Sequence, residues 1–264
     1  MQAFYINLAR RTDRRARMEQ LLAERGIAAD RIEAITPADL SDEQIQRYTA
    51  IGNLHNVTPA ELSCSLSHHL ALRRFLESGD THALIMEDDI VISKQVPALL
   101  KAIPPQCDIL RLETFMKTQH TWVKPDCQIG PFTLHRVDSI CYGTAAYVVS
   151  RRAALALVEH QQSLAFPYDH VLCNPYRLPC SRLKILQVNP AVARQMDRDP
   201  AGLYTSDVQV RAGTVPAKPF PVSMLHGMVE FWQREIRMGI PKTLRQLLGH
   251  TRRGIVPFDM DQNS

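Results

Sequence analysis

The 264-residue chain contains no long uncharged apolar stretch and no conventional N-terminal export signal. A membrane-spanning helix needs about 20 consecutive apolar residues, and no segment approaches that length. The apolar run at residues 3–8 is too short for a secretory signal and leads directly into Arg10 and Arg11. We therefore expect the protein to reside in the cytoplasm.

Cysteine is scarce and follows no ligand or disulfide pattern. The six cysteines show no Cys-x-x-Cys spacing, and apolar residues surround most of them. This arrangement indicates reduced thiols in the core rather than a disulfide framework.

Several common binding motifs are also missing. The 11 glycines form neither Gly-x-Gly-x-x-Gly nor Gly-x-x-x-x-Gly-Lys-Ser/Thr, so dinucleotide binding and P-loop phosphate binding have no support. The absence of Gly-x-Ser-x-Gly weakens the case for a serine hydrolase. Aromatic residues make up 6% of the chain and do not alternate with basic ones, which argues against a nucleic-acid partner.

The composition that is present, 45% apolar and 22% charged residues, is typical of a folded globular protein. The net charge of +4 is concentrated near the C-terminus, where residues 234–253 contain six basic residues and one acid. We expect a main domain at residues 1–221 and an amphipathic, basic helical segment at residues 222–264. That segment, with its helical pattern at 224–248, would pack on the main domain or lie on an anionic membrane surface.

Short apolar segments alternate with helical patterns along the main domain. Strands are expected at residues 3–8, 32–35, 83–86, 109–112, 132–137, 144–149 and 183–188. Helices are expected at 13–25, 41–48, 58–78, 96–101, 151–160 and 168–173, with Thr12, Thr58 and Ser150 as N-caps. Residues 114–130 and 197–221 are expected to be irregular. The alternation predicts an α/β fold whose sheet is mostly parallel and flanked by helices.

Three adjacent acids, Glu87, Asp88 and Asp89, stand between two apolar runs at the end of the strand 83–86. Partly buried neighbouring carboxylates repel one another and need a cation. In an extended chain Glu87 and Asp89 point to the same side, and their oxygens suit Mg²⁺ or Mn²⁺. The trio therefore indicates a divalent-metal site; the alternative is an acidic strand-to-loop junction without a ligand.

Polar residues also follow the first strand: Asn7, Arg10, Arg11, Asp13 and Arg14. At a strand end these side chains could hold the base, ribose or phosphates of a ligand. The alternative is a solvated turn with local ion pairs.

Three further residues have two interpretations each. Ser67 and His68 lie in the middle of an expected helix, where a histidine is more often a core residue than a ligand. Asp169 begins the last expected helix of the main domain. It either caps that helix or, near a metal-bound phosphate, acts as a general base.

Several segments together resemble glycosyltransferase family 25. YINLARRTDR (5–14) is similar to the opening strand and loop of that family, and SCSLSH (63–68) to its Gly-Cys-x-x-Ser-His helix, with Ser63 in place of the usual glycine. Glu-Asp-Asp (87–89) corresponds to its metal motif, YGTAAYVVS (142–150) to its Gly-Thr-x-x-Tyr-x-x-Ser junction, and PYD (167–169) to its Pro-x-Asp element. The matches keep the family's order and cover roughly residues 4–210.

The resemblance implies a GT-A-type nucleotide-diphosphosugar transferase fold, a UDP-sugar donor, most often UDP-galactose, and a lipooligosaccharide or lipopolysaccharide acceptor. It also implies Mn²⁺ (or Mg²⁺) and inversion at the anomeric carbon. Glu87 and Asp89 would hold the metal, and Asp169, or else Glu113, would be the catalytic base. The donor-binding residues would be Asn7, Arg11, Asp13, Arg14, Ser67, His68, Asp88, Gly143 and Thr144.

Two other functions fit part of the pattern. A metal-dependent phosphoesterase also gathers acids at strand ends, although it normally uses more His and Asp ligands than this sequence offers. A catalytically silent protein that only binds a nucleotide sugar is the second alternative.

Overall fold

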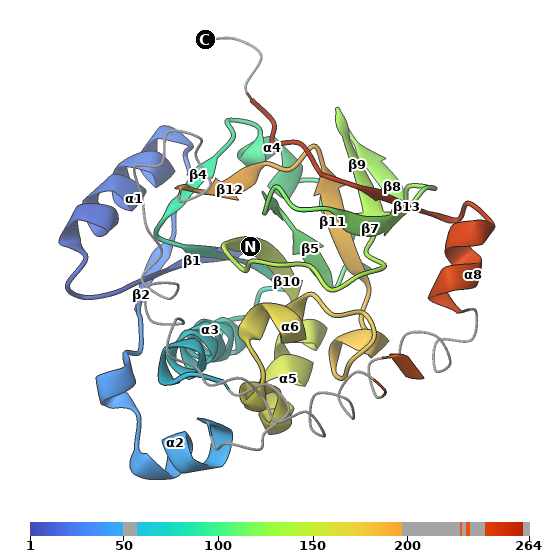
Figure 1. Cartoon of the computed structure of the whole chain (residues 1–264). Helices are drawn as coiled ribbons and strands as arrows, with labels where there is room; N and C mark the ends of the chain where they lie inside the picture. Colours follow the sequence, from blue (N-terminus) through green and yellow to red (C-terminus); the bar gives the residue numbers. More distant parts are fainter. Residues whose placement is uncertain (50–56, 197–227, 229–230, 233–240, 261–264) are drawn as a thin grey trace.

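The computed structural model describes the chain except for residues 50–56, 197–227, 229–230, 233–240 and 261–264. Its architecture is α/β, with a large mixed sheet flanked by helices, as expected for a GT-A-type domain (Figure 1). The predicted fold class is therefore confirmed. Within the described ranges, no helix combines the length and apolar character needed to cross a bilayer.

The main sheet has eight strands: β1 (Gln2–Asn7), β2 (Asp30–Glu33), β3 (His82–Glu87), β5 (Ile109–Arg111), β8 (Cys127–Ile129), β9 (Phe132–Arg136), β10 (Ala146–Ser150) and β11 (Ile185–Asn189). Their order is β2-β1-β3-β10-β5-β11-β9-β8. β1 is parallel to β2 and β3, and β11 is parallel to β5. The remaining pairs are antiparallel. The sheet is thus mixed and not mostly parallel, because β10 lies between β3 and β5 in the opposite direction.

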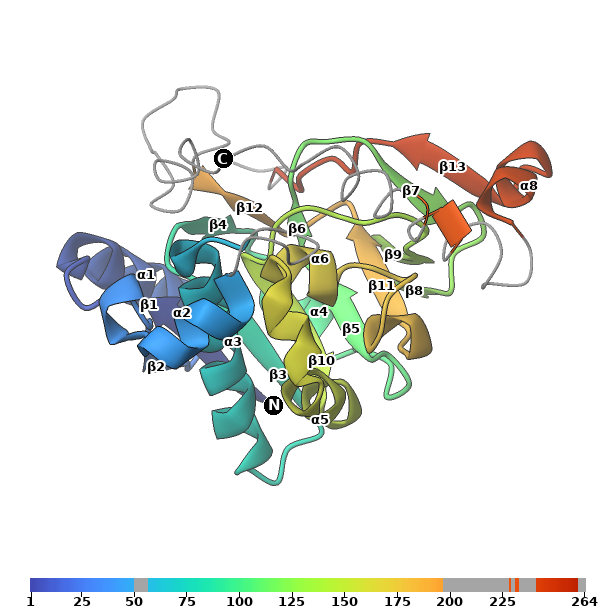
Figure 2. The same ribbon diagram turned by 60° about the horizontal axis from the view of Figure 1, so that its bottom comes forward.

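The helices are α1 (Thr12–Glu24), α2 (Asp42–Thr49), α3 (Pro59–Leu76), α4 (Val96–Leu100), α5 (Arg151–Glu159), α6 (Tyr168–Leu172) and α8 (Lys242–Leu247). α1 and α4 cover one face of the sheet, and α3, α5 and α6 cover the other (Figures 1 and 2). Side chains of β3 alternate accordingly: Leu84 and Met86 join the core under α1, while Ala83 and Ile85 join the core under α3. Both faces of β3 are therefore buried up to the acidic trio.

Two of the predicted helix N-caps, Thr58 at α3 and Ser150 at α5, are confirmed. Thr58 accepts a hydrogen bond from the backbone of Glu61, and the Glu61 carboxylate accepts one from the backbone of Thr58, which forms a capping box at α3. Ser150 caps α5. The prediction of Thr12 as an N-cap is wrong, because Thr12 is already inside α1 and follows Arg11. The capping box at α3 begins the helix that carries part of the site described below.

Residues 114–130 are more regular than expected. They contain β7 (Gln119–Trp122) and β8, and β7 pairs with β13 (Thr251–Gly254) from the C-terminal part of the chain. The predicted irregularity is wrong because β7 is stabilised by the remote strand β13, and β8 forms a hairpin with the next strand, β9. A third, smaller sheet joins β4 (Ile90–Ile92), β12 (Ala193–Gln195) and β6 (Glu113–Thr114).

The C-terminal residues that the structure describes contact the main body. Arg245 of α8 donates a 2.7 Å hydrogen bond to the Asp138 carboxylate, and both side chains are buried. The helix expected over 224–248 lies largely outside the described residues. The described residues of the segment 222–264 contain α8 and then a strand, β13, although this segment was expected to be helical.

Candidate active site

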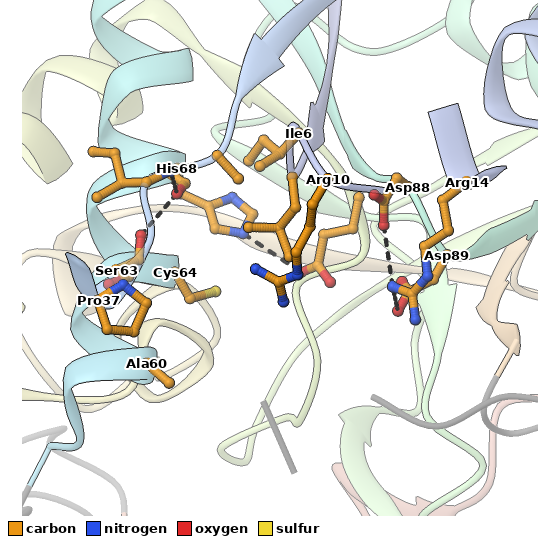
Figure 3. Close-up of a pocket in the computed structure, with 15 residues that line it drawn as sticks. Ile6, Arg10, Arg14, Pro37, Ala60, Ser63, Cys64, His68, Asp88 and Asp89 are labelled. Carbon is orange, nitrogen blue, oxygen red and sulfur yellow. Dashed lines mark hydrogen bonds and ion pairs between the residues drawn. The ribbon is translucent and has the colours of Figure 1, made fainter. Parts of the chain in front are cut away.

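The parallel pair β1 and β3 brings two polar strand ends to the same edge of the sheet. β1 ends at Asn7 and β3 ends at Glu87, and Asp88 and Asp89 follow directly. These acids line a pocket whose opposite wall is formed by α3 (Figure 3). Ligands of open α/β sheets bind outside the carboxyl ends of the strands, which is where this pocket lies.

The buried guanidinium of Arg14 pairs with two of the three acids. Its Nη1 atom lies 3.2 Å from Asp88 Oδ1 and 3.1 Å from Asp89 Oδ2. Arg14 reaches them from the first turn of α1 and is only 8% exposed. Two of the carboxylates are thereby fixed in direction and partly neutralised.

Asn7 holds Asp88 from the other side. The side-chain Nδ2 of Asn7 donates a 2.6 Å hydrogen bond to Asp88 Oδ2, and its side-chain Oδ1 accepts one from Arg31 at 3.0 Å. Burial nevertheless raises the pKa of Asp88 above its ordinary value, in spite of Asn7 and Arg14. Further positive charge in the pocket would therefore be favourable for this carboxylate.

Glu87 points toward α3 and β10. Thr144 donates a 2.7 Å hydrogen bond to Glu87 Oε1, and His68 Nε2 lies 3.4 Å from the same oxygen. Burial raises the pKa of Glu87, but His68, Thr144 and Arg14 outweigh it, so that the pKa lies below its ordinary value. Glu87 is therefore an anion in the pocket.

The loop before β10 links Glu87 to Asp169. Thr144 contacts Glu87, and the backbone N–H of its neighbour Gly143 points to Asp169 Oδ2 at 3.4 Å. Gly143 has φ +84°, and a Cβ atom there would lie 2.7 Å from Glu113 Oε2 and 2.9 Å from Phe115. Only glycine fits this position without displacing its neighbours.

Glu113, the second candidate base, lies beneath that loop. It is 1% exposed, and its Oε1 atom accepts a 3.0 Å hydrogen bond from the backbone of Ala145. Burial raises the pKa of Glu113 from its ordinary value of 4.5 to about 8, although Arg111 acts in the opposite direction. At neutral pH this carboxyl is mostly protonated, so it is poorly suited to accept a proton.

Not all the predicted donor-binding residues reach the pocket. Arg11 and Asp13 pair with each other at 2.9 Å, and the Asp13 side chain is 66% exposed. Neither lines the pocket among the described residues. Ser67 does line it, but its hydroxyl already bonds to the backbone of Ile35 and Ser63, which ties β2's continuation to α3.

Two residues, Cys64 and Arg111, were missing from the predicted site, and a third, Arg10, was predicted only as one of the polar residues after the first strand. Arg10, exposed in the loop after β1, lines the pocket between His68 and Asp88 (Figure 3). Cys64 lies one helical turn before His68 and also lines it. Arg111, buried within an otherwise apolar strand, donates to the backbone oxygens of Tyr142 and Gly143. A charged residue inside an apolar strand is the signal that could have identified Arg111.

Two of the three acids offer the donor type of a hard divalent ion, but among the described residues the trio is not a group whose ligand atoms all lie within 4.8 Å of one another. Glu87 and Asp89 both line the pocket with carboxylate oxygens, the donor type that Mg²⁺ and Mn²⁺ prefer. The trio carries three negative charges when ionised, and Arg14 is the buried cation paired with it. Glu87 and Asp89 are therefore the acids of this trio that could ligate such an ion.

Comparison with known protein families identifies the family of this chain. The family model "Glycosyltransferase family 25 (LPS biosynthesis protein)" matches residues 1–172, which is more than half of the chain. The chain therefore belongs to glycosyltransferase family 25, and the predicted family is confirmed. As a glycosyltransferase it uses a sugar donor and a saccharide acceptor.

Individual relatives are distant. The chain is 26% identical over 211 residues to lacto-N-neotetraose biosynthesis glycosyltransferase LgtE of Neisseria meningitidis serogroup B, covering 74% of each chain. It is 27% identical over 167 residues to human procollagen galactosyltransferase 2, covering 59% of this chain and 27% of that protein. Among solved structures, a glycosyltransferase involved in the glycosylation of the major capsid of PBCV-1 has a TM-score of 0.41 at 10% identity, with 76% of this chain and 95% of that chain covered.

The raised pKa of Glu113 predicts a specific pH dependence of stability. Because the folded pKa of about 8 exceeds the ordinary 4.5, the stabilisation is complete below about pH 4.5 and is lost as the pH rises toward 8. Glu113→Gln removes this titration. We expect the unfolding free energy of the native protein, relative to Glu113→Gln, to fall between pH 5 and pH 8 in urea titrations of the metal-free proteins. Parallel pH profiles for the two proteins would contradict the assignment.

Proposed function

We propose that this glycosyltransferase moves a hexose, galactose in the first instance, from a UDP-sugar to a saccharide acceptor of a lipooligosaccharide or lipopolysaccharide. The transfer inverts the anomeric carbon and depends on a divalent ion. The observation that carries the proposal is the clustering of Glu87, Asp88 and Asp89 with Asn7 and Arg14 at the ends of β1 and β3. The names of the relatives, which include galactosyltransferases and lacto-N-neotetraose biosynthesis, support the choice of sugar and acceptor.

Glu87 and Asp89 would hold the ion, Mn²⁺ or Mg²⁺, which when bound supplies positive charge for the phosphates of departing UDP. Asn7 and Arg14 keep Asp88 and Asp89 in fixed positions through the contacts described above. Arg10 is exposed and lines the pocket, so its guanidinium adds positive charge for the donor diphosphate. Donor recognition is thus assigned to the β1 side of the pocket.

Asp169 is our choice for the base that takes the proton of the acceptor hydroxyl. It is half-buried at the start of α6, and the Gly143–Thr144 segment connects it to Glu87. The hydrogen bond from Gly143 is long, at 3.4 Å, so that Oδ2 keeps acceptor capacity for a hydroxyl. Glu113, by contrast, is buried and mostly neutral at pH 7.

The proposed reaction is tested with a panel of UDP-sugars and Mn²⁺, by measuring UDP release with and without a lipooligosaccharide acceptor. We expect UDP-galactose to give the fastest acceptor-dependent release and Asp89→Ala to abolish it, because a ligand of the diphosphate-bound ion is lost. Asp42→Ala, which removes an exposed acid of α2, serves as the matched control and should retain activity. Full activity of Asp89→Ala would refute the metal assignment. Hydrolysis of phosphate esters, or tight UDP binding with no turnover, would favour the two alternative functions.

The role of Asp169 is tested by Asp169→Asn, which keeps the shape of the side chain but removes its basicity. We expect UDP binding by calorimetry to be retained and transfer to fall by about 10²–10⁴-fold, the usual contribution of a general base. Glu113→Gln is the comparison, because its carboxyl is already mostly neutral at pH 7 and its activity should be largely preserved. Unchanged turnover in Asp169→Asn would remove it as the base.

We also propose that the protein works at the cytoplasmic face of the inner membrane, with residues 222–264 as the contact segment. Its described residues include exposed apolar side chains, among them Trp232 and Leu247, and exposed Arg252 and Arg253. Such a combination binds anionic lipid surfaces. We expect co-sedimentation with vesicles that contain anionic lipid, and weaker binding when Arg252 and Arg253 are replaced by Gln. Binding that does not depend on anionic lipid would exclude this contact.

A further inference from the structure

Three potential metal ligands of different chemistry converge on the α3 side of the pocket. Cys64 and His68 are four residues apart on α3, hence on one face of the helix, and Glu87 faces them from the end of β3. One ligand atom from each residue lies within 4.8 Å of the other two. In the described part of the chain, no other set of three His, Cys, Asp or Glu residues meets this condition. All three residues line the pocket, so a solvated ion has access to them.

The nitrogen of His68 that faces this space has no hydrogen-bond partner among the described residues. His68 is only 1% exposed, and its Nε2 atom lies 3.4 Å from Glu87 Oε1 without the geometry of a hydrogen bond. A buried polar atom without a hydrogen-bond partner destabilises the folded protein. A cation between this nitrogen and the carboxylate would remove that destabilisation.

The surroundings hold the two side chains in position. The other ring nitrogen of His68, Nδ1, lies 3.1 Å from the hydroxyl of Tyr147, which in turn lies 3.1 Å from the hydroxyl of Tyr168. Tyr168 also stacks on the imidazole at 4.3 Å. Thr144 fixes the Glu87 carboxylate. Metal-binding histidines typically hydrogen-bond through their second nitrogen in this way, and when Nδ1 carries the proton, Nε2 is left as the ligand atom.

We propose that Cys64, His68 and Glu87 form a site for a borderline-soft divalent ion of the Zn²⁺ or Co²⁺ type. Sulfur, imidazole nitrogen and carboxylate oxygen make a three-ligand set that Zn²⁺ commonly takes, with the fourth position open. As the metal–sulfur bond forms, the Cys64 thiol releases its proton to solvent. The site differs from the Glu87–Asp89 pair, whose two carboxylates suit hard ions.

The two sites share Glu87, which links the inference to the proposed function. A soft ion held by Cys64 and His68 takes a carboxylate away from Mn²⁺, so it should inhibit Mn²⁺-dependent transfer. This consequence alone rests on the proposed reaction. Binding of the soft ion to the free protein does not, and it can be measured without donor or acceptor.

The test is a titration of the metal-free protein with Co²⁺, followed by absorption spectroscopy. We expect one equivalent to bind, with a thiolate-to-cobalt charge-transfer band that Zn²⁺ abolishes by displacement. Cys64→Ser should lose the band, whereas Cys127→Ser, which removes another partly exposed thiol outside the cluster, should keep it. Tyr147→Phe removes the hydroxyl group that lies beside His68 Nδ1 and the Tyr168 hydroxyl. This variant should weaken Co²⁺ binding by about 10–100-fold while the band remains.

Folding of each variant is checked by circular dichroism and by retained UDP binding. Absence of the band in the native protein, or its persistence in a folded Cys64→Ser variant, would overturn the proposal and leave His68 and Glu87 as an ion pair only. In the activity assay, Zn²⁺ should raise the Mn²⁺ concentration needed for half-maximal transfer in the native protein, but much less in Cys64→Ser. If the native protein shows no transfer at all, the Co²⁺ result still decides the metal site.

Discussion

The ion pairing of one buried arginine with two adjacent carboxylates is the interaction on which this site depends. Asp88 and Asp89 follow a fully buried strand, so their charges cannot be relieved by moving into solvent. Arg14 provides the compensating charge from α1, and removing one partner of a buried ion pair typically costs about 3–5 kcal/mol. Because Arg14 must reach both carboxylates, the first turn of α1 must lie close to the end of β3. This position of α1 also places the loop from Asn7 to Arg14, which forms the β1 side of the pocket.

The second constraint comes from the direction of β10. Because β10 is antiparallel to β3, the residues that precede β10 lie at the carboxyl end of β3. Thr144 thereby reaches Glu87, and Gly143 reaches Asp169. If β10 were parallel to β3, the residues that follow β10 would lie at the pocket instead of those that precede it. The departure from a mostly parallel sheet is thus what brings Thr144 to Glu87 and Gly143 to Asp169.

The parts of the structure that the sequence predicted correctly are those encoded by neighbouring residues. The capping box of α3, the cap of α5 and the buried strand before Glu87 each depend on patterns within a few positions. The errors concern pairing over long distances: β7 is stabilised by β13, more than 100 residues later in the sequence. The same holds for the site, where the acids were recognised but Arg111, which binds the backbone of the Gly143 loop, was not. No local pattern shows that Arg111 donates to the Gly143 loop.

Glu87 has a distinct position in this arrangement because it faces two kinds of ligand environment. On one side Asp88 and Asp89 are already bound to Arg14 and, for Asp88, to Asn7, so these oxygens are held in place. On the other side Cys64 and His68 present sulfur and nitrogen. A hard ion gains most from the carboxylates and from donor phosphates, whereas a soft ion gains most from the α3 side chains. In the proposed scheme, a diphosphate in the pocket would add oxygen ligands on the carboxylate side of Glu87, and the ion bound there would then depend on whether the donor is present.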